Sequence, residues 1–84
     1  MSLTETEMEV LHDLAVNGDN VPSNIAENTG RHPKSVSRSL SGETNSLESR
    51  GYVRNKGRGV WTITGEGRSE LNYYVSNLID EEKD

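Results

Sequence analysis

Apolar residues recur every three to four positions near the start of the chain: Met8, Leu11, Leu14 and Ala15. This spacing predicts an amphipathic helix over residues 3–17. Thr4 suits an N-cap, and Glu7 follows three residues later, which is the pattern of a capping box. Gly18 comes directly after the helical pattern and is a typical C-terminal stop. We expect this helix to be scaffold.

Two further helices are expected, joined by a tight turn. A residue that precedes proline disfavours the helical backbone, so Asn20–Val21 should be a short extended piece. The second helix then covers Pro22–Thr29 and stops at Gly30, and the third begins at Pro33. Two helices around a short glycine-containing turn are the spacing of a helix-turn-helix.

The length of the third helix depends on how residues 41–44 (SGET) behave. Val36 and Leu40 are one helical turn apart, and Leu47 lies seven residues beyond Leu40, close to the same apolar stripe. A glycine inside a helix costs about 1 kcal/mol relative to alanine, so a local break is an alternative. We expect a continuous helix that ends near Arg50.

A hairpin follows, with strands expected over residues 52–55 and 60–63. Two glycines in residues 56–59 supply the positive φ angles that a tight hairpin turn needs. Trp61 and Ile63 alternate with a polar residue and should face the core. Basic residues surround the turn: Arg54, Lys56 and Arg58. A phosphate backbone or a minor groove is the natural partner for such crowding, and a merely solvated hairpin is the alternative.

The last helix is expected over residues 64–79, with Thr64 as its cap. Its apolar residues form one stripe at helical spacing: Leu71, Tyr74, Val75 and Leu78. Such a stripe can fold back on the first helix or pair with the same helix of a second copy. We prefer the second alternative, a homodimer, and assign the stripe to dimerisation. Residues 80–84 should form a frayed acidic tail.

The composition limits what this chain can be. Its 84 residues suffice for one small domain over residues 1–84, with a core over 3–68 that is thin because only 30% of residues are hydrophobic. There is no cysteine, and His12 and His32 are the only histidines, so we expect no metal site and no cofactor. No catalytic constellation is visible, and an enzyme is not expected.

No membrane partner or secretion is expected. No stretch is long and apolar enough to span a bilayer. Residues 1–20 lack the basic start and the apolar run of a secretion signal, which predicts a cytoplasmic protein.

The charge of −5 is unevenly distributed. Residues 1–30 hold six acids and no lysine or arginine, residues 31–68 hold eight bases against three acids, and residues 69–84 hold five acids and one lysine. An acidic protein with a basic middle can bind DNA on one face and solvate the others. Chance is the alternative explanation in so short a chain.

The acidic excess also resembles the cytoplasmic proteins of halophiles. Only three lysines are present, whereas Asp, Glu, Ser, Asn and Gly are abundant. Carboxylates keep a protein hydrated and soluble in molar salt. A mesophilic acidic protein remains the alternative.

Four stretches together resemble the winged helix-turn-helix: VPSNIAENTGRHPKSVSRSL, LESRGYV, RNKGRGVWTIT and GEGRSEL. VSRSL with LESRGYV is similar to the recognition helix and wing of MarR-like prokaryotic repressors. With the acidic composition, the chain most resembles the short winged-helix group of haloarchaea and their viruses, the halophage-repressor-like proteins. The resemblance covers about residues 4–75 and departs in one respect, because Leu40 and Leu47 are seven residues apart instead of three.

The resemblance implies a fold that is mainly α with a small β-hairpin, a winged helix-turn-helix with an additional C-terminal helix. It implies that the third helix contacts bases in a major groove through Lys34, Ser35, Ser37 and Arg38. The DNA backbone or minor groove would meet a second set of residues: Ser23, Arg31, His32, Arg54, Lys56 and Arg58.

The expected function is therefore a sequence-specific regulator of transcription that binds double-stranded DNA, with repression as the commoner outcome in the resembling group. A homodimer would bind an inverted repeat. The alternative is a protein-interaction winged helix that docks onto the transcription or replication machinery.

Overall fold

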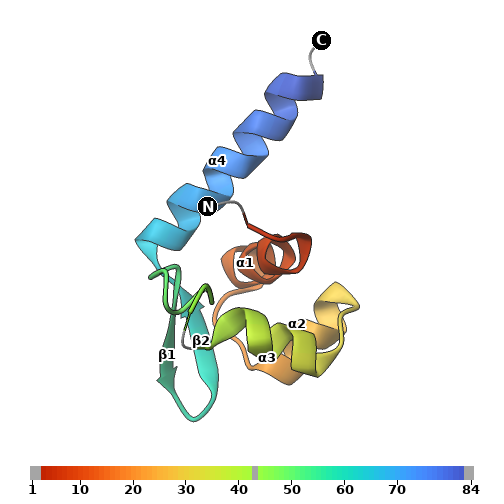
Figure 1. Ribbon diagram of the computed structural model, residues 1–84. Coiled ribbons are helices and arrows are strands. Elements are labelled where there is room, and N and C mark those ends of the chain that lie inside the picture. Colours follow the sequence, from red (N-terminus) through yellow and green to blue (C-terminus); the bar gives the residue numbers. More distant parts are fainter. Residues whose placement is uncertain (1–2, 43, 83–84) are drawn as a thin grey trace.

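The computed structural model describes residues 3–42 and 44–82, with side chains as far as Tyr74. The described residues form six elements: α1 (Glu5–Asn17), α2 (Pro22–Thr29), α3 (Pro33–Leu40), β1 (Val53–Gly57), β2 (Val60–Ile63) and α4 (Gly65–Glu82). Figure 1 shows α1, α2 and α3 gathered beside the hairpin, while α4 extends away from this body. The predicted fold class is confirmed: a mainly helical α+β domain with a winged-helix-like layout.

Helix α1 is the centre of the core. Val10, Leu11 and Leu14 are completely or almost completely buried, and α1 packs on α2, α3, α4 and β2. The other buried apolar residues are Leu3, Ile25, Ala26, Val36, Leu40, Leu47, Val53, Trp61, Ile63 and Leu71. Burying one such side chain contributes about 1.5–3 kcal/mol, so this small core depends on nearly every element.

Local capping explains where α1 begins and ends. The hydroxyl of Thr4 accepts from the Glu7 backbone N–H at 3.1 Å, and the Glu7 carboxylate accepts from the Thr4 N–H at 2.9 Å. The predicted capping box is therefore confirmed, and the helix begins at Glu5, two residues later than expected. Gly18 ends it at φ +87°, and its N–H donates to the carbonyl of Leu14.

The hairpin is antiparallel and differs slightly from the predicted one. Strand β1 runs to Gly57, two residues further than expected, and the register shifts between Asn55 and Gly57. Arg58 and Gly59 form the turn with φ angles of +56° and +76°. Asn20 forms an isolated antiparallel bridge with β2, because its N–H and carbonyl exchange hydrogen bonds with Trp61 at 3.1 and 2.8 Å.

The expectation of a continuous third helix is wrong. Helix α3 ends at Leu40, and Ser41 has an extended backbone with φ −130° and ψ 148°. The chain then folds back on the end of α3, where the N–H of Leu47 donates to the carbonyl of Ser39 at 2.8 Å. Glu48 donates to the carbonyl of Leu40 at 2.9 Å in the same way.

The break follows from the burial of Leu47. In a continuous helix, Leu47 would lie about 10 Å beyond Leu40 along the helix axis. Folding back instead places both leucines in the core with no exposed surface. The returning amides also satisfy carbonyls that the last turn of α3 would leave without partners. Residues 41–46 contain one glycine and two serines, which have low helix propensity, so ending the helix there loses little helical stability.

The start of α4 is packed against both α1 and the hairpin. Leu71 is buried, and the Tyr74 hydroxyl accepts from the Leu3 backbone N–H at 2.8 Å. The first half of α4 thus folds back on α1, one of the two alternatives considered. The helix continues to Glu82, three residues beyond the expected end. The side chains of Val75 and Leu78, the rest of the predicted dimerisation stripe, lie outside the described residues.

A nearly buried ion pair connects α1 to the segment that precedes the hairpin. Glu7 and Arg50 are in direct contact, with 9% and 16% of their side chains exposed. Arg50 also donates to the carbonyls of Asn45 and Ser46 at 3.0 and 3.3 Å. Its guanidinium lies over the ring of Tyr52, 5.6 Å from the ring centre. The pair therefore fixes residues 45–52 against α1.

We predict that Gly67→Ala destabilises the fold by about 3 kcal/mol, the upper end for overpacking. A β-carbon at residue 67 would clash with the backbone carbonyl of Tyr52 and press on Ile63. Gly65→Ala is the matched control, since nothing lies within 4 Å of its added carbon. Urea denaturation of both variants measures the difference, and equal stabilities would contradict the close approach.

We predict that Glu7→Gln costs about 3 kcal/mol, because it leaves Arg50 charged and mostly buried without its partner. Glutamine at this position preserves the capping box, so the loss reports the ion pair. The double variant Glu7→Gln with Arg50→Met should recover part of the loss in urea denaturation. The exposed Glu48→Gln serves as the control and should change stability by less than about 0.5 kcal/mol. A Glu7→Gln variant as stable as this control would show that the pair contributes little.

Candidate nucleic-acid interface

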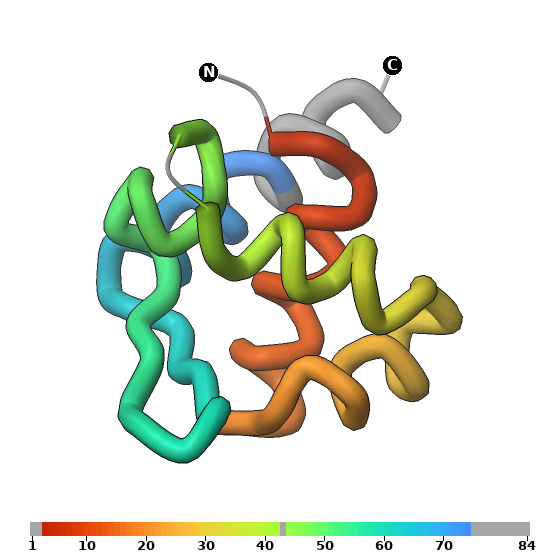
Figure 2. The backbone as a smooth tube through the Cα atoms, turned by 60° about the horizontal axis from the view of Figure 1, so that its bottom comes forward, coloured from red at the N-terminus to blue at the C-terminus, as the bar shows by residue number. Residues whose placement is uncertain are grey.

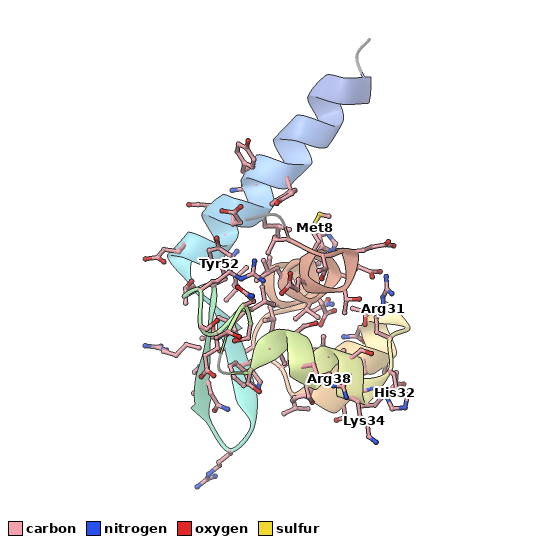
Figure 3. The ribbon with its side chains drawn as sticks, viewed as in Figure 1. Met8, Arg31, His32, Lys34, Arg38 and Tyr52 are labelled. Carbon is pink, nitrogen blue, oxygen red and sulfur yellow. The ribbon has the colours of Figure 1, made fainter. Side chains whose placement is uncertain are left out.

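Helix α3 presents a polar face to solvent. Val36 and Leu40 are buried, whereas the four predicted base-contacting residues are all exposed: Lys34, Ser35, Ser37 and Arg38. Figure 3 shows Lys34 and Arg38 on the outside of this helix. Among the described residues, neither the Lys34 nor the Arg38 side chain has an ion-pair partner. The structure thus brings these four residues together on one short helix.

The turn that precedes α3 is built mainly by local interactions. Gly30 adopts the left-handed conformation at φ +71°, which ends α2 and redirects the chain. His32 is the N-cap of α3, and its Nδ1 accepts from the Lys34 backbone N–H at 3.1 Å. Pro33 occupies the first helical position. His32 therefore has a structural role in addition to the predicted phosphate contact.

Arg31 is held by acids of α1. Its Nε donates to the Glu9 carboxylate at 2.7 Å, and its Nη2 lies 3.3 Å from the Glu5 carboxylate. Glu5 and Glu9 are one turn apart on α1 and enclose the guanidinium between them. Ser23, the other predicted phosphate contact in this region, is exposed in the first turn of α2. Arg31 is thus already paired, whereas Ser23 is open to solvent.

The hairpin carries the second group of predicted residues. Arg54, Lys56 and Arg58 are all exposed. Lys56 Nζ lies 2.7 Å from the carboxylate of Asp19, in the connection between α1 and α2. The hydrogen bond from Lys56 is the main cause that holds the pKa of the Asp19 carboxyl below its ordinary value, and the neighbouring Thr62 acts in the same direction.

The basic middle of the sequence is partly neutralised within the fold. Three of its eight bases, Arg31, Arg50 and Lys56, form ion pairs with acids of the first 30 residues. On α3 and the hairpin, four bases have no ion-pair partner among the described residues: Lys34, Arg38, Arg54 and Arg58. The hairpin lies beside the C-terminal end of α3 (Figures 1 and 2), so these bases belong to neighbouring elements.

Sequence reasoning missed Asp19, Glu5 and Glu9 as partners of the predicted phosphate contacts. The i, i+4 spacing of Glu5 and Glu9 indicates that one cation could contact both. The identity of the basic residue that pairs with Glu5 and Glu9 depends on how α1 packs against the turn before α3. No local signal in the sequence predicts the contact between Asp19 and Lys56.

A second surface feature is an open hollow along α1, with a volume of about 630 Å³. Apolar side chains from α1 and α4 contribute to its wall, including Met8, Val16 and Leu71. Val16 is 66% exposed, so its side chain is accessible at the hollow. Acidic and polar residues complete the lining: Glu5, Glu9, His12, Asp13, Asn17, Asn28 and Thr29.

Within the described part of the chain, no three His, Asp or Glu side chains gather closely enough to hold a metal ion. None of the described helices combines the length and the apolar character needed to span a lipid bilayer. Comparison with protein-family models finds no match, and no curated protein matches the chain significantly.

Proposed function

We propose that this chain is a winged-helix transcription regulator of the halophage-repressor-like kind, which binds double-stranded DNA in the cytoplasm of a halophile or its virus. In this proposal α3 lies in a major groove and the hairpin contacts the backbone or minor groove. The observation that carries the proposal is the pair of exposed basic elements, α3 and the hairpin, on an otherwise acidic molecule. Repression is the outcome we expect at a promoter.

The dimensions and chemistry of α3 support base reading. An α-helix with its side chains is about 10–12 Å in diameter, and the major groove is about 12 Å wide. Lys34 and Arg38 are one turn apart and face solvent together. Arginine can form two parallel hydrogen bonds with guanine, which contributes about 1–3 kcal/mol of discrimination. Ser35 and Ser37 add short donors and acceptors beside them.

The hairpin turn supports a backbone contact. Arg58 has a positive φ of +56°, in a turn position where glycine, asparagine or aspartate is strongly preferred. A non-glycine residue in this conformation is uncommon and unfavourable. A cationic side chain at this exposed tip is well placed to reach a phosphate. Arg54 lies on the adjacent strand and has no ion-pair partner among the described residues.

High salt favours contacts that are short and direct. At molar salt the Debye length is about 3 Å, so attraction over longer distances is largely screened. Hydrogen bonds from Arg38 and Lys34 to bases act at contact distance and lose less of their strength. A halophilic regulator with few but well-placed basic residues is consistent with this constraint.

We further propose that the active form is a homodimer. Leu71 and Tyr74 already pack within one chain, yet the hollow along α1 leaves Met8 and Val16 accessible beside α4. A second copy that packs there would cover this apolar surface. Two copies would then place their α3 helices in successive major grooves, about one helical turn apart.

We predict that Arg38→Ala removes sequence preference, whereas Arg58→Ala weakens binding equally on all duplexes. The operator is first selected from a random DNA pool in high KCl. Binding is then measured on the selected and a scrambled duplex over a range of salt concentrations. Arg58→Ala should also reduce the salt slope by about 0.9, the value of one phosphate contact.

Equal losses on both duplexes for Arg38→Ala would exclude its base-reading role. Failure of the unaltered protein to enrich any sequence, together with no binding to the scrambled duplex, would contradict DNA binding as a whole.

We predict that Val16→Glu converts the dimer to a monomer in sedimentation analysis, because the new carboxylate lies in the hollow beside Met8 and Leu71. Glu48→Gln, an exposed change in the segment between α3 and β1 that does not line the hollow, is the control and should leave the dimer intact. A monomeric unaltered protein at every concentration would contradict the proposed dimer.

A further inference from the structure

Asp19 has an exposed carboxylate that lies among the basic side chains of the hairpin. It belongs to the connection between α1 and α2, which joins β2 through the paired backbones of Asn20 and Trp61. Its Oδ2 lies 2.7 Å from Nζ of Lys56. Arg54 and Thr62, which pair directly across the hairpin, also act on this carboxylate. An acid therefore sits on the solvent face of the element that we assign to the DNA backbone.

We propose that Asp19 is an internal competitor for DNA phosphate, which occupies Lys56 and restrains sequence-independent binding. This inference rests on the proposed DNA-binding function. The Asp19 carboxylate uses one of the three N–H donors of Lys56 and offsets its positive charge, so a phosphate gains less from Lys56 while this ion pair is present. DNA that approaches the hairpin must therefore displace Asp19 from Lys56, or bind beside an offset positive charge and tolerate the nearby carboxylate.

The physical effect has a defined sign. Two like charges at about 6 Å repel appreciably even near a solvated surface, so Asp19 weakens the binding of every duplex regardless of sequence. Its removal frees Lys56 for one additional phosphate contact. A purely structural role for Asp19 predicts the opposite result, because loss of the ion pair would loosen the hairpin and weaken binding.

We therefore expect Asp19→Asn to tighten binding to DNA. The probe is a mixed-sequence duplex about two helical turns long, titrated by fluorescence anisotropy. At about 0.1 M salt the Kd should fall about three- to tenfold. The dependence of log Kd on log salt should steepen by about one unit, as expected for one more phosphate contact. In a Lys56→Met background, the same substitution should have a much smaller effect.

Glu66→Gln is the control with the same change of charge. Glu66 lies in the first turn of α4, at the end of the hairpin opposite to its turn, and is exposed. The Glu66 carboxylate lies beside Gly51, five residues before Lys56, and an extended chain rises about 3.3 Å per residue. This separation exceeds the Debye length of about 10 Å at this salt, so the Kd of the Glu66→Gln variant should change less than about twofold. A gain as large as that of Asp19→Asn would show that net charge alone acts, and would overturn the inference.

A second measurement tests the ion pair without DNA. NMR titration of the side-chain carboxyls should find the pKa of Asp19 below its ordinary value in the unaltered protein and higher in Lys56→Met. An unchanged Asp19 pKa in that variant would overturn the inference.

The binding results separate the two proposals. If the unaltered protein binds DNA and Asp19→Asn binds equally well or more weakly, the competitor role is wrong while the proposed function stands. If neither protein binds any duplex, the proposed function fails and the inference fails with it.

Discussion

The contact between Glu7 and Arg50 is the constraint on which the placement of the hairpin depends. Glu7 is fixed at the start of α1 by its capping bond to Thr4, and α1 packs on every other helix. Arg50 lies in the segment that returns from α3, shortly before β1 begins at Val53. One nitrogen of Arg50 is buried without a hydrogen-bond partner in the described structure, so the charge requires Glu7 in place. The two side chains thus set where β1 begins relative to α1.

Local signals made most of the elements predictable. The capping box at Thr4, the proline at the start of α2 and the glycine that ends it each act within a few residues. The hairpin was predictable because two glycines and alternating apolar residues define it, although β1 extends two residues further than expected. The exposure of Lys34, Ser35, Ser37 and Arg38 followed from the helical spacing of Val36 and Leu40, which form the buried face of α3.

The features that could not be predicted depend on contacts between distant residues. Helical spacing alone placed Leu47 on the same stripe as Leu40, but packing in the core required the chain to fold back. Similarly, the acids and bases were visible in the sequence, whereas their partners were not. Arg31 and Lys56 are paired with acids 22 and 37 residues away. The number of basic residues in a segment therefore overestimates the number that are available to bind a ligand.

The short length of α3 also limits how much information one copy can extract from DNA. Base pairs are stacked about 3.4 Å apart, so a helix about 12 Å long faces only about four of them. Because four base pairs are distinguishable at each position, a specific sequence of four base pairs recurs by chance about once in 250 base pairs. Two copies bound to one site would recognise about eight base pairs, and a specific sequence of that length recurs about once in 65,000 base pairs. If the chain regulates transcription as proposed, the early end of α3 at Leu40 thus means that selective binding to one site in a genome requires a second copy.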